Sequence, residues 1–171
     1  MSKEDGEKLL SLITPTPDYA SLADADLVIE AVFEDRTVKK EVTEKIEAVL
    51  REDAIFASNT STLPITGLAK NSKRPRKFIG IHFFSPVDKM MLVEVILGKE
   101  TGDRALATAL DYVAAIRKTP IVVNDTRGFY VNRCVFRYMA EAYDMLIEGV
   151  PAAMIENAAK MAGMPVGPLS L

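Results

Sequence analysis

The feature that most constrains the fold is a series of short, continuous apolar runs separated by stretches of helical length. These runs occupy residues 27–32, 54–57, 77–84, 92–97 and 121–123. Apolar and polar residues do not alternate within them, which is typical of strands buried on both faces. Strands that alternate with helices indicate βαβ units. The sequence therefore predicts an α/β fold with a doubly wound, mainly parallel sheet.

The stretches between the runs predict helices. Residues 37–51 carry apolar side chains three or four positions apart, which is the spacing of one helix face. A second helix is expected to begin near residues 61–64, where hydroxyl groups can cap it and Pro64 suits the first turn. A third helix is predicted over residues 103–117, after the fourth apolar run.

After Gly128 the sequence predicts helices only. Residues 129–147 form one long helical pattern, and a second pattern runs over residues 151–162. We therefore predict two domains, an α/β domain over residues 1–125 and the first helices of an all-α domain over residues 126–171. Two helices cannot bury their apolar faces alone, so we expect more polypeptide to complete this second domain.

Composition excludes several classes of protein. The chain is 49% apolar and 26% charged, as ordinary globular proteins are, and its 21 basic and 24 acidic residues give a net charge of −3. This balance gives no reason to expect nucleic acid or an anionic membrane as a partner. No apolar run reaches about 18 residues, so no membrane span is expected. Cys134 is the only cysteine, which argues against disulfides and metal clusters and favours a reducing compartment, the bacterial cytoplasm.

His82, the only histidine, lies near the end of a predicted buried strand. It is either a hydrogen-bonded core residue or a general base, for which imidazole is well suited near neutral pH. Glu94 is a lone carboxylate in an apolar strand, where a charge is unfavourable unless paired. Residues 82 and 94 are symmetric about Asp88, so a hairpin would place them opposite each other on one face. The pair is then either a structural ion pair or a base with its orienting carboxylate.

Other polar residues gather where strands are predicted to end. Residues 58–62, Ser-Asn-Thr-Ser-Thr, are either a helix cap or donors at the ligand crevice of an open sheet. Glu34 and Lys39 follow the first strand, where cofactor ribose groups often bind, although on their own they indicate a solvated helix start. Asn132, at the start of the long helix, is on its own a packing or surface residue.

One motif is absent. None of the nine glycines forms the G-x-G-x-x-G pattern that cradles a dinucleotide pyrophosphate after a strand. The sequence therefore predicts an incomplete dinucleotide-binding fold.

Five segments resemble, in order and spacing, successive motifs of the 3-hydroxyacyl-CoA dehydrogenases. They are residues 28–35 (VIEAVFED), 55–61 (IFASNTS), 81–86 (IHFFSP), 92–95 (LVEV) and 128–133 (GFYVNR). The resemblance extends over residues 17–171, and residues 86–90 (PVDKM) are most similar to the fused multifunctional α-chains of fatty-acid β-oxidation. It implies a partial Rossmann-like sheet, without its first βαβ unit and glycine-rich turn, followed by the start of the helical dehydrogenase domain.

The resemblance also implies roles for individual residues. His82 matches the catalytic base and Glu94 its carboxylate partner, while Ser61 and Asn132 match groups around the reacting end of the substrate. The positions that match NAD-binding residues near the nicotinamide are Val32, Phe33, Glu34, Lys39, Ser61 and Ser85. Ser85 replaces an asparagine common in the family, as it often does in the fused branch.

The activity implied is reversible, NAD-dependent oxidation of an L-3-hydroxyacyl-CoA to the 3-ketoacyl-CoA. Because the phosphate-binding turn is missing, we expect the isolated chain to bind NAD poorly and to turn over slowly or not at all. We expect a homo-oligomer or a part of a larger multifunctional polypeptide, with the edge of strand 27–32 as an association site.

Two alternatives stay open. One is a non-catalytic assembly or CoA-binding remnant of the same fold, and the other is a related reductase that acts on another 3-hydroxy acid. The spacing of His82 and Glu94, together with Phe83-Phe84-Ser85-Pro86, favours an acyl-CoA substrate over the second alternative.

Overall fold

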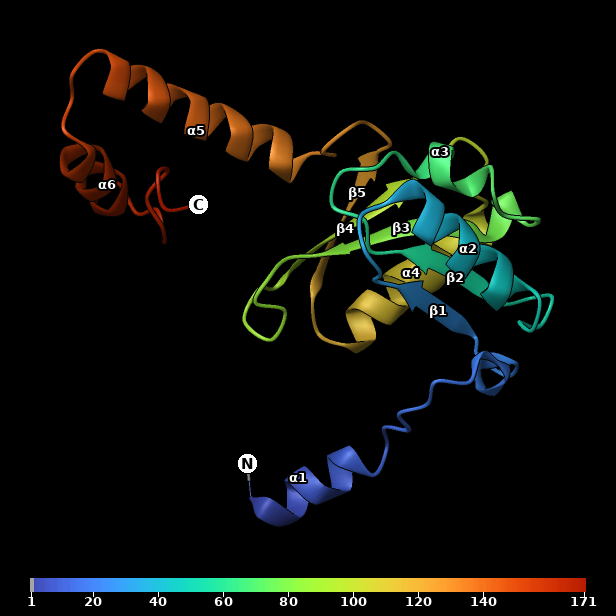
Figure 1. Cartoon of the computed structure of the whole chain (residues 1–171). Coiled ribbons are helices and arrows are strands. Elements are labelled where there is room, and N and C mark those ends of the chain that lie inside the picture. The colour runs from blue at the N-terminus through green and yellow to red at the C-terminus, as the bar shows by residue number, and fades with distance from the viewer. Residues whose placement is uncertain (1) are drawn as a thin grey trace.

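The computed structural model describes residues 2–171, which form a five-stranded sheet in the order β1-β2-β3-β4-β5 (Figure 1). The strands are β1 (Leu27–Glu30), β2 (Ile55–Ser58), β3 (Phe78–Phe83), β4 (Leu92–Leu97) and β5 (Thr119–Asn124). Neighbouring strands are parallel except β3 and β4, which form an antiparallel hairpin. The predicted α/β fold with a mainly parallel sheet is confirmed.

The five predicted helices are present, with ends that differ by a few residues from the expected ones, and α1 precedes them. The helices of the structure are α1 (Lys3–Leu10), α2 (Arg36–Glu47), α3 (Ile65–Ala69), α4 (Asp103–Ala115), α5 (Val131–Ile147) and α6 (Ala152–Met161), with short 3-10 turns at Tyr19–Leu22 and Pro75–Lys77.

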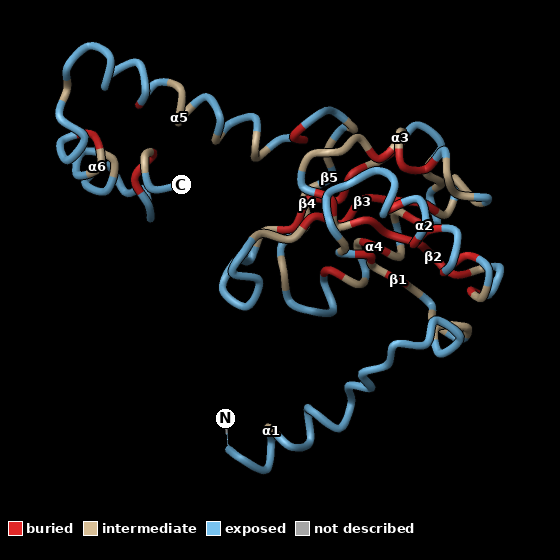
Figure 2. Tube along the Cα trace, viewed as in Figure 1, coloured by how far each residue is buried: buried red, intermediate tan, exposed pale blue. Residues whose placement is uncertain are grey.

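The sheet lies between two layers of helices, so it has a core on each face. On one face Phe56 and Phe78 stack with ring centroids 5.2 Å apart, beneath the apolar side chains of α2 and α3. On the other face Ile79 and Val95 pack under α4. Successive strand residues point to opposite faces, which is why continuous apolar runs supply both cores. Figure 2 shows that buried residues are concentrated along the strands.

The start of α3 differs from the prediction. The hydroxyls of residues 61–62 do not cap the helix. Instead the carboxylate of Asp125, just after β5, accepts hydrogen bonds from the backbone N–H groups of Ile65 and Thr66, both at 2.7 Å. The capping residue is therefore distant in sequence, where a local motif cannot reveal it.

The second part of the chain leads away from the sheet. Helix α5 extends outward and α6 packs back against it (Figure 1). Only Ala142 and Ile155 are buried on these two helices, and large apolar side chains such as Phe136 and Ile147 are exposed. As expected, the pair leaves most of its apolar surface uncovered. No helix within residues 2–171 is long and apolar enough to cross a bilayer.

Candidate active site

The hairpin of β3 and β4 joins His82 to Glu94. The two residues are register partners, and Nδ1 of His82 lies 2.8 Å from Oε2 of Glu94. Both side chains are buried, at 4% and 0% exposure. An ionised carboxylate can only accept a hydrogen bond, so Nδ1 of His82 carries a proton, and in the neutral imidazole the lone pair is on Nε2. The predicted pairing is confirmed.

Aromatic rings surround the histidine. The ring centroid of Phe84 lies 4.5 Å from that of His82, and the centroid of Phe129 lies 5.9 Å away. The imidazole therefore has two apolar rings nearby and a carboxylate at one nitrogen, and its second nitrogen is its remaining polar group. Such an arrangement suits either a structural ion pair or an oriented base.

The other oxygen of Glu94 binds the start of α5. Oε1 accepts hydrogen bonds from the backbone N–H groups of Tyr130 at 3.0 Å and Val131 at 2.8 Å. Burial acts to raise the pKa of Glu94, but hydrogen bonds from His82, Val131 and Tyr130 together outweigh it and lower the pKa below its ordinary value. Glu94 is therefore an anion in spite of its burial.

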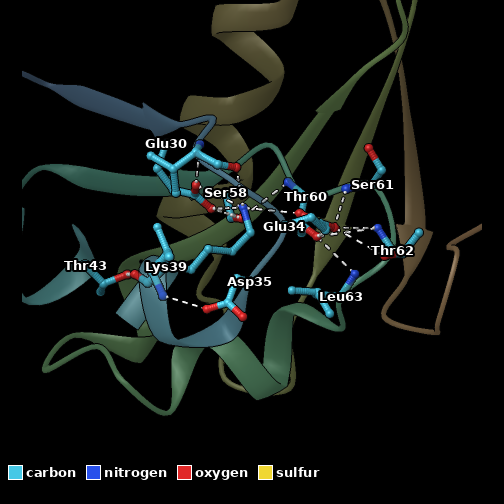
Figure 3. A network of polar contacts seen from close by, with 12 residues as sticks. Glu30, Glu34, Asp35, Lys39, Thr43, Ser58, Thr60, Ser61, Thr62 and Leu63 are labelled. Carbon is cyan, nitrogen blue, oxygen red and sulfur yellow. Dashed lines mark hydrogen bonds and ion pairs between the residues drawn. The ribbon is translucent and has the colours of Figure 1, made fainter. Parts of the chain in front are cut away.

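A second polar network lies at the ends of β1 and β2 (Figure 3). The ammonium group of Lys39 is 3.0 Å from both carboxylate oxygens of Glu30, and both side chains are almost fully buried. The Ser58 hydroxyl donates to the same carboxylate. Lys39 also lies 3.3 Å from Glu34. The buried lysine therefore pairs with two glutamates, of which Glu30 is buried and Glu34 is partly exposed.

Glu34 holds the loop that follows β2. Its Oε1 accepts hydrogen bonds from the backbone N–H groups of Ser61 and Thr62, each at 3.1 Å, and from the Thr60 hydroxyl. This explains the polar run at residues 58–62: Ser58 and Thr60 point inward and bind carboxylates, and neither caps α3.

The structure brings Ser61 and Asn132 together, since Nδ2 of Asn132 donates to the Ser61 carbonyl oxygen at 2.9 Å. The predicted cofactor residues are more dispersed. Val32 donates its N–H to Glu30 at 3.1 Å, and Phe33 is 87% exposed.

Ser85 lies apart from both networks. It is exposed after β3 and lines an apolar pocket of about 510 Å³ between the β3–β4 loop and the helical part. Within residues 2–171 no hydrogen bond connects its side chain with the Glu34 network.

Sequence reasoning missed several residues that build the site. Glu30 is a lone carboxylate in an apolar strand, the same signal that drew attention to Glu94, and would have been found by the same argument. Phe129 and the amides of Tyr130 and Val131 gave no signal, because their part depends on where α5 begins.

Comparison with known families assigns both parts of the chain. A sequence model of the "3-hydroxyacyl-CoA dehydrogenase, NAD binding domain" matches residues 1–126, and one of the "3-hydroxyacyl-CoA dehydrogenase, C-terminal domain" matches residues 128–171. The chain belongs to the 3-hydroxyacyl-CoA dehydrogenase family. Its sheet is a Rossmann-like, NAD-binding fold, and its last helices begin the helical domain of this family.

Curated relatives in the family are much longer than this chain. The fatty acid oxidation complex subunit alpha of Shewanella amazonensis is 46% identical over 171 residues, which is 100% of this chain and 24% of the relative. The corresponding subunit of Shewanella loihica is 46% identical over 165 residues, covering 96% of this chain and 23% of the relative. The chain thus spans about a quarter of these proteins.

Solved structures of dehydrogenases match the fold closely. An (S)-3-hydroxybutyryl-CoA dehydrogenase from Ralstonia eutropha superposes with a TM-score of 0.94 at 36% identity, over 99% of this chain and 60% of that one. A 3-hydroxybutyryl-CoA dehydrogenase from Escherichia coli gives a TM-score of 0.91 at 36% identity, over 99% of this chain and 36% of that one.

The ionised carboxylates make stability depend on pH. Desolvation acts to raise the pKa of Glu34, but the hydrogen bond from Thr60, the charge of Lys39 and other hydrogen bonds lower it below 4.5. A depressed pKa stabilises the fold above the unfolded-state value, and this stability is lost as pH falls through the folded-state value. We expect Glu34→Gln to have a lower free energy of unfolding at neutral pH. As the pH falls from neutral to acid, this free energy should decrease less than it does in the unchanged protein. Denaturant titrations at several pH values measure both, and parallel curves for the two proteins would contradict the assignment.

Proposed function

We propose that this chain carries the catalytic centre of an NAD-dependent L-3-hydroxyacyl-CoA dehydrogenase of fatty-acid β-oxidation. The observation that carries the proposal is the buried His82–Glu94 pair at 2.8 Å, which supports a neutral histidine that donates through Nδ1 and accepts a proton at Nε2. The family membership and the names of the similar proteins support the substrate class.

His82 acts as the base in this proposal. Its Nε2 accepts the proton of the substrate's 3-hydroxyl group, and Glu94 stabilises the imidazolium through Nδ1. Asn132 uses one N–H for the Ser61 carbonyl, which leaves its second N–H and its Oδ1 for the substrate oxygen. NAD+, when bound, supplies the acceptor for the hydride from C3.

The residues present fit the nicotinamide half of the cofactor. Glu34 orders the loop that contains Ser61 at the carboxyl ends of β1 and β2, where ligands bind in open α/β sheets. The exposed ring of Phe33 offers an apolar surface at the same edge. We assign Lys39 to positioning Glu34, because its ammonium group is buried among Glu30 and Glu34.

We propose that residues 1–125 and 126–171 are parts of two domains, with the site at their junction. The bacterial curated relatives support a cytoplasmic, reducing compartment, and their length supports a multifunctional polypeptide.

The function is tested by following NADH formation from L-3-hydroxybutyryl-CoA, with the D-enantiomer and free 3-hydroxybutyrate as controls. Because the glycine-rich phosphate-binding turn is missing, we expect slow oxidation, and of the L-thioester only. Binding is tested separately through the ring signals of His82, the only histidine, during titration with acetoacetyl-CoA and NAD+. Unchanged signals together with no turnover would favour a non-catalytic remnant of the fold.

We also propose that the chain associates through β1, which pairs only with β2 among the described residues. A free strand edge is a template for pairing with another chain. We expect light scattering to show oligomers whose proportion rises with concentration. The Leu27→Lys variant places a charge on the edge strand and should shift the distribution to monomer, whereas equal masses for both proteins would contradict this route.

A further inference from the structure

The connection into α5 has an unusual backbone. Gly128 and Phe129 both have positive φ, at 74° and 49°. A bulky residue in this region is uncommon and its backbone is strained. The Phe129 side chain is nevertheless only 1% exposed, and it packs in the sheet core with its ring near His82. Phe129 therefore anchors the start of α5 to the sheet.

The bend that these two residues make aims the first amides of α5 at Glu94. The backbone N–H groups of Tyr130 and Val131 converge on Oε1, while Oε2 receives Nδ1 of His82. One carboxylate thus joins the helical part of the chain to the histidine. α5 has 17 residues, so the positive end of its dipole also favours the anion.

A second contact holds the same turn. Asn132, one residue further along α5, donates to the Ser61 carbonyl, and the Gly128 N–H reaches the Thr62 carbonyl at 3.4 Å. The first turn of α5 is therefore attached to the loop after β2 as well as to β4.

We propose that the first turn of α5, anchored by Phe129, is the positioning element that orients His82 through Glu94. With the turn in place, Glu94 is fixed at one oxygen and the histidine is held as the Nδ1–H tautomer with Nε2 towards the substrate. When the turn leaves the sheet, Glu94 loses two of its three donors, and the imidazole is free to exchange tautomers and orientation. The proposal deepens the dehydrogenase function and rests on it for its catalytic meaning.

The test uses the single histidine as a reporter. We expect ring-nitrogen NMR of the unchanged protein to show one tautomer, with a slowly exchanging Nδ1 proton. Phe129→Ala removes the anchor and should give both tautomers, faster exchange of this proton and a fall in kcat of about tenfold or more, with KM for NAD+ less affected. Tyr143→Ala truncates an aromatic residue on α5 that is 49% exposed, and should behave like the unchanged protein.

A second variant covers the case in which Phe129→Ala does not fold. At Gly128 an added Cβ would make only ordinary contacts, the nearest at 3.6 Å, so Gly128→Ala acts through the positive φ alone. We expect Gly128→Ala to give both tautomers of His82 and faster exchange of the Nδ1 proton, as Phe129→Ala does.

Retention of one Nδ1–H tautomer with slow exchange in both variants overturns the proposal. Absence of both acyl-CoA oxidation and acetoacetyl-CoA binding by the unchanged protein would count against the proposed function instead, because the tautomer measurement needs neither.

Discussion

Replacement of His82 by glutamine is expected to lower kcat for L-3-hydroxybutyryl-CoA by about 10²–10⁴-fold, the contribution of a general base. Nδ1 of His82 lies 2.8 Å from Oε2 of Glu94, and the side-chain amide of glutamine can donate a hydrogen bond to the same oxygen. Glutamine has no group that accepts a proton near neutral pH. Because the carboxylate keeps a partner, the free energy of unfolding should change little. Steady-state NADH formation and denaturant unfolding measure the two effects.

Glu94→Gln is the matched variant for this experiment. Its amide can donate to Nδ1 and so favours the wrong tautomer, in which Nε2 carries the proton. We expect a similar fall in kcat with His82 still present. An enzyme that keeps more than a tenth of its turnover in either variant would show that the pair is structural.

Replacement of Lys39 by methionine is expected to destabilise the fold by about 3–5 kcal/mol, because it leaves the buried Glu30 carboxylate without its cation. Methionine preserves the length of the side chain, so the lost charge is the main change. The free energy of unfolding from denaturant titration measures it.

A second substitution separates charge from packing. The Glu30→Gln and Lys39→Met double variant removes both charges and should recover much of the lost stability, since a buried pair contributes little compared with neutral groups of similar shape. Lys40→Met is the surface control, because its side chain is 54% exposed, and it should change stability by less than about 0.5 kcal/mol. Equal effects at positions 39 and 40 would contradict the buried network.

Much of the fold could be predicted because its signals are local. Continuous apolar runs gave the strands and their burial on two faces, and the symmetric spacing of residues 82 and 94 predicted the pair that the hairpin forms. The helix cap was predicted wrongly, because Asp125 reaches Ile65 and Thr66 from the far end of β5. Nothing in the residues around Asp125 indicates that its carboxylate contacts this helix start.

Some residues of the candidate site could likewise be found from the sequence, and the roles of others could not. Unpaired polar residues in apolar strands, such as His82 and Glu94, are visible in the sequence, since burial demands a partner for them. The roles of Lys39 and Glu34 were not visible, because a charged residue at a helix start looks the same whether it faces solvent or a buried carboxylate.

The sequence by itself determined that the chain forms a two-sided α/β sheet, that one imidazole and one carboxylate meet in it, and which family it resembles. The tertiary structure alone decided how that carboxylate is held, by amides that a bend at Gly128 and Phe129 turns towards it. The reason is physical. Hydrophobic periodicity and the spacing of residues are properties of neighbours along the chain, whereas the direction of a backbone N–H depends on the dihedral angles of a junction between two parts of the fold.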